Sequence, residues 1–235
     1  MPSLSQSVVL VTGANGGIGS AFVHAALARG AAKVYASARS PREWDDDRVV
    51  PLALDVTDSA SIAAGVAVAS DVPVLINNAG GLPATASVLE VTEEDLRRTM
   101  EINFFAPLLV ARAFAPLLVA AGDAVLIDMH SVASWYAFGG AYSASKAALW
   151  SATNSLRLEL APRGVLVTGV HVGYVDTAMA AHSDDPKLAP ADLVDTVLDG
   201  VENGAVEIVA DELSAQVKAG LAAPIEVLYP EVLRP

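Results

Sequence analysis

A phenol and an ammonium lie four positions apart in the second half of the chain. Tyr142 and Lys146 belong to the segment "AYSASKAALW" (141–150), in which almost every other side chain is small. On a helix, this spacing places both side chains on one face, one turn apart. A tyrosine half in the core beside an exposed lysine is the ordinary explanation. A pair that does chemistry together is the alternative, and the rest of the sequence has to decide.

A glycine-rich segment near the N-terminus is typical of phosphate binding. Gly13, Gly17 and Gly19 of "VTGANGGIGSA" have the spacing G-x-x-x-G-x-G, between an apolar β-branched run and a segment with helical spacing. Glycine allows a tight turn and lets backbone amides approach a pyrophosphate. The helix that follows directs its positive N-terminal end at the same anion. The position between strand and helix therefore predicts a dinucleotide site, and a merely tight turn is the alternative.

The end of the second expected strand bears on which dinucleotide binds. An acidic residue there would accept hydrogen bonds from the adenosine ribose and favour NAD. The chain instead reads Ser37-Ala38-Arg39 at this place. An arginine near the 2′-position favours a 2′-phosphate, so we expect NADP(H) to be preferred and NAD(H) to remain possible. An ordinary surface arginine is the alternative.

Strands and helices alternate along the chain that has to hold these residues. Short apolar runs predict strands at 7–13, 33–39, 49–56, 72–80, 123–131, 165–173 and 205–210. Apolar residues at helical spacing predict helices at 17–30, 58–69, from Thr92 onward, 140–164 and 191–204. Strands that are apolar throughout have both faces covered. We therefore expect one α/β domain over residues 1–235, a Rossmann-type doubly wound parallel sheet of about seven strands with helices on both faces.

Composition argues against several classes of partner. The 235 residues carry a formal net charge of −13, whereas nucleic acid and anionic membranes require a basic surface, so we expect neither. There is no cysteine and the four histidines are not grouped as ligands, so we expect no metal. The apolar segment 104–122 contains Arg112 and two prolines, which favours a buried or subunit-contacting helix over a membrane span. The N-terminus lacks the basic start of a signal peptide, and we expect a cytoplasmic protein.

Five short motifs occur in an order known from one enzyme family. They are "TGANGGIG" (12–19), "NNAG" (77–80), Asn103 in "EINFF", a serine after the fifth strand, and "YSASK" (142–146). In these residues, and over residues 6–210, the chain resembles the classical short-chain dehydrogenases/reductases. The resemblance implies an oxidoreductase that transfers a hydride between NADP(H) and a carbonyl or secondary alcohol. A sensor or scaffold of the same fold that binds NADP(H) without turnover is the alternative.

The resemblance also implies catalytic roles for four residues. Tyr142 would be the general acid/base, and the positive charge of Lys146 would lower the pKa of its phenol from about 10. Ser131 would hydrogen-bond the substrate oxygen, with Ser134 as the rival serine. Asn103 would hold a water of the proton relay, or else be a buried asparagine satisfied at a helix kink. The presence of all four residues favours an enzyme over the sensor.

Cofactor contacts are implied in the same way. Asp55 and Val56 would lie against the adenine, although Asp55 suits a turn at a strand end as well. The complete expected set is Gly13, Asn15, Gly17, Ile18, Gly19, Arg39, Asp55, Val56, Asn77, Ala79, Gly80, Tyr142, Lys146, Gly173, Val175 and Thr177. Two positions depart from the family pattern: Val172 stands where proline is usual, and His130 where serine or threonine is common.

The remaining expectations concern substrate and assembly. Large apolar side chains near the catalytic segments predict a cleft for a small to medium apolar alcohol or ketone, although they could instead pack against a second subunit; they are Trp135, Tyr136, Phe138, Tyr174 and Met179. Residues 176–190 are expected to form a mobile lid and residues 211–235 a C-terminal tail of one weak helix and an irregular end. The long apolar helices at 104–121 and 140–160 predict a homodimer or homotetramer.

Overall fold

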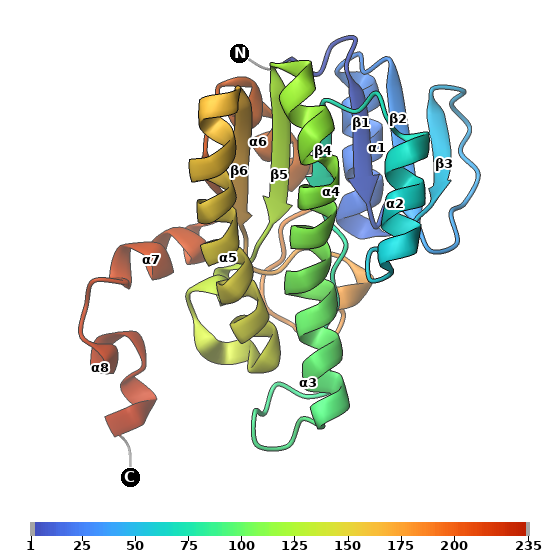
Figure 1. The fold of residues 1–235 in the computed structure, drawn as a ribbon. Coiled ribbons are helices and arrows are strands. Elements are labelled where there is room, and N and C mark those ends of the chain that lie inside the picture. Colours follow the sequence, from blue (N-terminus) through green and yellow to red (C-terminus); the bar gives the residue numbers. More distant parts are fainter. Residues whose placement is uncertain (1–2, 234–235) are drawn as a thin grey trace.

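A single parallel sheet runs through the computed structural model of the protein, which describes residues 3–233 (Figure 1). Its strand order is β3-β2-β1-β4-β5-β6-β7. The strands are β1 (Val8–Thr12), β2 (Lys33–Ala38), β3 (Val49–Ala53), β4 (Val74–Asn77), β5 (Ala124–Met129), β6 (Val165–His171) and β7 (Glu207–Val209). The predicted sheet of seven parallel strands is confirmed, and each strand lies inside its predicted range.

Helices cover both faces of the sheet. One layer holds α1 (Gly17–Ala28) and α6 (Pro190–Glu202), which pack against each other. The other layer, in front of the sheet in Figure 1, holds α2 (Ser59–Val68), α4 (Ala106–Ala121) and α5 (Ala141–Leu160). This doubly wound arrangement is the predicted Rossmann-type fold, in which helices connect the consecutive parallel strands, except for β2 and β3, which the loop 39–48 joins.

Successive residues of the inner strands face opposite helix layers. On β1, Val9 and Val11 belong to the same core cluster as Phe22 of α1. Leu10, between them, belongs to the second cluster together with Phe114 of α4. All five side chains are fully buried. Because both sides of the sheet are core, these strands carry apolar residues throughout instead of alternating with polar ones.

A long helix contains a local irregularity that the sequence did not reveal. Thr92 caps α3 (Glu93–Met100) through its hydroxyl, as its sequence position predicts. A π-helical turn, Glu101–Phe105, then joins α3 to α4. By length and composition alone, the continuous helix Glu93–Ala121 would be sufficient to cross a membrane, a test that core helices of soluble proteins also pass. Fully buried Phe114 shows that the α4 part packs against the sheet.

The C-terminal segment is more ordered than predicted. It forms α7 (Glu212–Gly220), α8 (Ile225–Leu228) and a 3-10 turn (Pro230–Leu233), and it extends away from the sheet in Figure 1. Asp211 caps α7 and also accepts a hydrogen bond from the Gly173 amide. Farther along, the ring of Tyr229 stacks on Tyr136, with centroids 4.9 Å apart. The segment is therefore attached to the main domain both at α7 and at Tyr229.

Candidate active site

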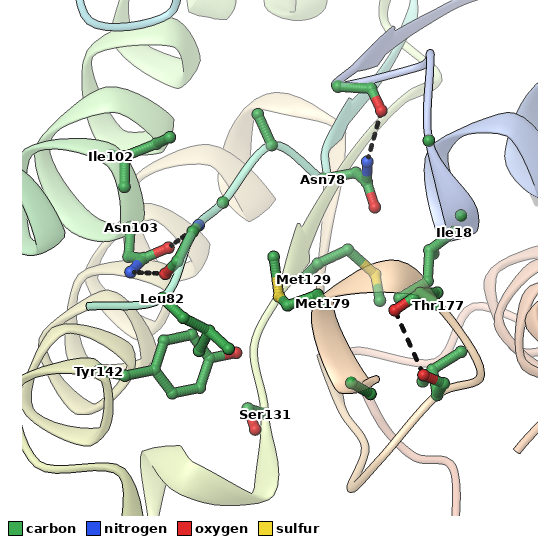
Figure 2. Close-up of a pocket in the computed structure, with 18 of the residues that line it drawn as sticks. Ile18, Asn78, Leu82, Ile102, Asn103, Met129, Ser131, Tyr142, Thr177 and Met179 are labelled. Atoms are coloured by element: carbon green, nitrogen blue, oxygen red, sulfur yellow. Dashed lines mark hydrogen bonds between the residues drawn. The ribbon is translucent and has the colours of Figure 1, made fainter. Parts of the chain in front are cut away.

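A pocket of about 1400 Å³ opens at the carboxyl edge of the sheet, where the strand order reverses between β1 and β4 (Figure 2). Open α/β sheets bind their ligands at this place. Sites for one small molecule usually measure roughly 300–1000 Å³, so the pocket has room for a dinucleotide and a second small molecule. The predicted residues that line it are Gly13, Asn15, Gly17, Ile18, Gly19, Arg39, Asp55, Val56, Ala79, Gly80, Asn103, Ser131, Tyr142, Lys146, Gly173, Val175 and Thr177.

The glycine loop is packed too tightly for side chains at two of its positions. A Cβ on Gly19 would lie 2.2 Å from the carbonyl oxygen of Gly13, and one on Gly17 would lie 2.6 Å from Thr177 Cγ2. Gly17 also has a φ of +35°, which L-residues rarely adopt. Among the described residues, no side chain caps the start of α1. The free amides at this helix N-terminus therefore point to an anion in the pocket.

On the glycine-loop side of the pocket, the cation Arg39 and the carboxylate Asp55 lie near each other. Arg39 is exposed and lines the pocket after β2. Asp55 is half-buried, and its Oδ1 accepts hydrogen bonds from Thr57 N at 2.9 Å and Thr57 Oγ1 at 2.7 Å. These bonds, with a smaller contribution from Arg39, lower the pKa of Asp55. Asp55 thus forms the strand-end turn and lines the pocket as well.

Asn77 is the one predicted contact that lies outside the pocket lining. As a β4 residue it faces the core, where its Nδ2 donates to Asp128 Oδ1 at 2.9 Å and to the Pro107 oxygen at 3.0 Å. The next residue, Asn78, lines the pocket in its place and donates to the Thr12 oxygen at 2.8 Å (Figure 2). Side chains alternate along a strand, so the two-residue period of β4 was the signal that could have distinguished the two asparagines.

Tyr142, Ser131 and Lys146 meet at the opposite side of the pocket. Figure 2 shows the Tyr142 ring pointing from α5 into the cavity, with Ser131 below it on the loop after β5. Lys146 Nζ lies 5.8 Å from the centroid of the Tyr142 ring and donates to the Met129 oxygen at 2.7 Å. Ser131 lines the pocket, whereas its rival Ser134 is buried outside the lining.

The pKa values of this pair differ from the expectation. Burial raises the pKa of Tyr142 to about 12, and the nearby Ser131 hydroxyl only partly opposes this effect. Burial also lowers the pKa of Lys146 to about 8, against the attraction of Asp128. The expected lowering of the phenol pKa is therefore not found in this structure, because removal of the phenolate from water dominates the shift.

Asn103 lies in the π-helical turn and is fully buried. Its Oδ1 accepts from Gly81 N at 3.0 Å and its Nδ2 donates to the Gly81 oxygen at 2.8 Å (Figure 2). The side chain thus has hydrogen-bond partners at a helix irregularity, which is the second of the two roles expected for Asn103. The turn still brings residue 103 to the pocket, and single π-helical turns are frequent at functional sites.

The substrate end of the pocket is largely apolar. Phe138, Tyr174 and Met179 line it as predicted, and Leu82 and Ile102 join them. Trp135 and Tyr136 belong elsewhere. The Trp135 ring stacks on His171, with centroids 3.6 Å apart, and Tyr136 stacks on Tyr229. These two aromatic side chains pack inside their own chain, so the expectation that they border the cleft is wrong.

Comparison with known proteins identifies the family. The model of the short chain dehydrogenase family matches residues 7–187. The chain belongs to the short-chain dehydrogenase family. This result confirms the resemblance seen in the sequence. Among residues 3–233, no group of three or more potential metal ligands was found.

Three similar proteins illustrate the range of this short-chain dehydrogenase's relatives. A short-chain dehydrogenase from Burkholderia cenocepacia, solved with NADP, has a TM-score of 0.91 and 36% identity, covering 99% of this chain and 100% of that one. One from Sphingobium yanoikuyae, solved with NADPH, has a TM-score of 0.82 and 25% identity, covering 96% and 95%. An NADPH-dependent 1-acyldihydroxyacetone phosphate reductase from Schizosaccharomyces pombe is 35% identical over 184 residues, which are 74% of this chain and 61% of the relative.

Proposed function

We propose that the chain is an NADP(H)-dependent oxidoreductase that interconverts a small to medium, apolar ketone and its secondary alcohol. The observation that carries this proposal is that one pocket is lined both by the glycine loop and by Tyr142, Ser131 and Lys146. A binding protein needs only the first of these groups. The second supplies a proton donor and a hydrogen-bond partner at the place where a carbonyl oxygen would bind.

The residues present fit a phosphorylated dinucleotide. The amides of the glycine loop and the start of α1 would hold the pyrophosphate, and Asp55 and Val56 would border the adenine. Arg39, exposed at the end of β2, would take the 2′-phosphate. The two solved relatives contain NADP and NADPH, which agrees with this preference. When bound, the cofactor supplies or accepts the hydride.

The protein's own part in the reaction is to move a proton and to stabilise charge. In carbonyl reduction, Tyr142 would donate its phenolic proton to the substrate oxygen while Ser131 hydrogen-bonds the same oxygen. Lys146 would hold the nicotinamide ribose and place a positive charge near the phenol as its proton leaves. Asn103, through the π-helical turn, would contribute to the path that returns the proton.

The charge of the pocket lining favours a neutral substrate. Arg39 and Lys146 are its only lysine or arginine residues in the described structure. Both have roles toward the cofactor in this proposal, and the substrate end is bordered by Leu82, Phe138 and Met179. A phosphate on the substrate, as in the name of the S. pombe relative, would find no guanidinium or ammonium there. Segment 176–190, several of whose residues line the pocket, would close over the substrate.

We further propose a cytoplasmic homodimer or homotetramer assembled through α4 and α5. Leu158 of α5 is 79% exposed and Phe105, directly before α4, is 44% exposed. Large exposed apolar residues on two adjacent helices would be covered in such an assembly. The strongly negative net charge, −13, argues against nucleic acid and anionic membranes as partners.

A substrate screen tests the proposed function. Ketones and alcohols of graded size and polarity are incubated with NADPH or NADP⁺, and the absorbance of the reduced nicotinamide is followed. Turnover of apolar ketones with NADPH, with phosphorylated analogues poorer, is expected. Tight NADPH binding without turnover of any carbonyl or alcohol would instead support the alternative, a cofactor sensor.

A further inference from the structure

A chain of buried polar side chains lies beside the residues proposed for catalysis. Asp128 Oδ2 on β5 lies 2.7 Å from Thr153 Oγ1 on α5, and Thr153 Oγ1 lies 2.9 Å from His130 Nε2. His130 Nδ1 lies 3.1 Å from His171 Nε2, and His171 Nδ1 lies 3.3 Å from the backbone oxygen of Ser131. The four side chains from Asp128 to His171 are at most 4% exposed. The chain thus connects the interior of the sheet with the predicted catalytic serine.

The last acceptor determines where the protons are. A carbonyl oxygen only accepts, so His171 must carry a proton on Nδ1 to bond Ser131. In a neutral His171, Nε2 then accepts from His130 Nδ1–H, and His130 Nε2 accepts from the Thr153 hydroxyl. Thr153, having used its proton, can only accept from Asp128, which is therefore protonated. Every member donates once, in one direction, from Asp128 to the Ser131 carbonyl.

A second arrangement reverses the donors and requires charges. If Thr153 donates to Asp128 or to the Leu149 oxygen, 2.9 Å away, His130 must be protonated on Nε2. His171 would then have to carry protons on both nitrogens, as a buried cation, to satisfy His130 and Ser131 together. Burial opposes this state, because it lowers the pKa of both imidazoles and raises that of Asp128.

The surrounding charges agree with neutral histidines, whereas Lys146 and Arg157 favour an ionised Asp128; burial, the largest effect, raises the pKa of Asp128 against them. Lys146 and Arg157 both disfavour a positive charge on His130 and His171. On the outer side, Glu207 Oε1 lies 3.6 Å from His171 Nε2, and Glu207 itself forms an ion pair with Lys218. Lys218 likewise disfavours a charged His171. This carboxylate is therefore already paired with a cation.

The rings of both histidines are held in place by their neighbours. A Cβ on Gly169 of β6 would lie 2.7 Å from His130 Cε1, so the ring occupies the space that any side chain at 169 would need. His171 is stacked under Trp135 at an interplanar angle of 14°. Neither imidazole can rotate away from its hydrogen-bond partners without disturbing the core.

We propose that His171 is a positioning residue, which the chain Asp128–Thr153–His130–His171 orients so that it holds the Ser131 carbonyl. Ser131 is the second residue after β5 and has an extended backbone. Its carbonyl accepts from Ser134 N at 3.0 Å as well as from His171, and its Oγ accepts from Ala133 N at 3.1 Å. His171 would therefore help to hold the backbone from which Oγ projects. The proposed consequence for catalysis rests on the proposed function. The proton arrangement itself does not depend on it.

Two variants of Thr153 test whether the hydrogen-bonded side chains contribute to catalysis. Thr153→Val removes the hydroxyl at nearly constant shape, and Thr153→Ser is the matched control that keeps it. We expect Thr153→Val to lower kcat by about tenfold, with KM and the NADPH Kd within about threefold, and Thr153→Ser to restore kcat. Equal kcat in the two variants, or a loss in kcat that Thr153→Ser does not restore, would overturn the positioning role.

Nitrogen NMR of the histidine rings tests the proton arrangement without reference to turnover. In ¹⁵N-histidine-labelled wild-type protein, near neutral pH, His130 and His171 should both be neutral and protonated on Nδ1, the less common tautomer. Signals are assigned with His130→Asn and His171→Asn. A His130 protonated on Nε2, or a doubly protonated His171, would contradict the proposed arrangement of protons. If the tautomers are as expected but no substrate turns over, the proposed function is wrong, whereas the proposed arrangement of protons is confirmed.

Discussion

Among the residues proposed for catalysis, burial favours the neutral form of both Tyr142 and Lys146. It raises the pKa of Tyr142 to about 12 and lowers that of Lys146 to about 8. Near neutral pH the phenol therefore keeps its proton, which is the form that donates to a carbonyl oxygen. In the proposed mechanism we therefore expect carbonyl reduction to be favoured over alcohol oxidation near neutral pH, because oxidation requires the phenolate.

Arg39 provides the most direct test of cofactor preference. Its guanidinium should bind the 2′-phosphate in a charge-assisted pair worth roughly 1.5–3 kcal/mol, or about ten- to a hundredfold in affinity. We expect wild-type protein to bind NADPH more tightly than NADH, and Arg39→Ala to remove most of that difference. Arg163→Ala makes the same charge change at an exposed position before β6, at the other edge of the sheet, and should leave the preference intact. Calorimetric titration measures the affinities of the wild type and of both variants for NADPH and NADH. Equal wild-type affinities would make Arg39 only a surface charge.

The buried histidines should make the fold sensitive to acid. Burial lowers the pKa of His171 from 6.5 to about 3, and that of His130 well below 6.5. Below about pH 6.5 the unfolded state holds more protons, so stability falls as pH falls, by up to about 1.4 kcal/mol per pH unit for each imidazole. Asp128, with its raised pKa, contributes in the opposite sense.

Urea unfolding between about pH 7 and about pH 5 measures this effect. His171→Asn should flatten the decline in the free energy of unfolding, although it lowers stability overall. His182→Asn removes an exposed imidazole and should keep the wild-type slope. Equal slopes in all three proteins would show that His171 is not neutral in the fold.

At the scale of elements, local patterns predicted more than contacts between distant segments. The strands, the Thr92 cap and the glycine loop all follow from short-range periodicity and turn chemistry, and they are found where expected. The roles of Asn77 and His130 depend on Asp128 and His171, which lie 51 and 41 residues away along the chain. No short pattern specifies such partners. The π-helical turn at Asn103 was missed for a related reason, since its side chain is held by Gly81 from another loop.

Within the glycine loop, two neighbouring glycines should respond differently to the same substitution. Gly19→Ala would put a methyl group 2.2 Å from the Gly13 oxygen, so the loop must shift and cofactor affinity should fall by about tenfold or more. Gly16→Ala is the matched control. A Cβ there meets nothing within 4 Å and the backbone φ is −126°. Titration with NADPH measures the cofactor affinity of both variants, and thermal unfolding measures their stability. Wild-type affinity in Gly19→Ala would disprove that the loop's close packing serves the dinucleotide.

For the whole molecule, the main prediction concerns assembly. Light scattering at micromolar concentration should give two or four times the mass of one chain. Leu158→Glu places a charge on the exposed face of α5 and should shift the protein toward monomers, because burying an unpaired carboxylate is costly. Val68→Glu, at an exposed apolar position at the end of α2, should leave the mass unchanged. A wild-type monomer would contradict assembly through α4 and α5.

We propose that Tyr142 transfers the proton in an NADP(H)-dependent reaction, and the variant Tyr142→Phe is the direct test of this role. The substitution removes only the hydroxyl, so the pocket and the glycine loop are retained. Once a ketone substrate is found, kcat and the NADPH Kd are measured for the variant and the wild type. We expect turnover to fall by about a thousandfold or more while the Kd stays within a few-fold. Turnover within about tenfold of wild type would contradict it.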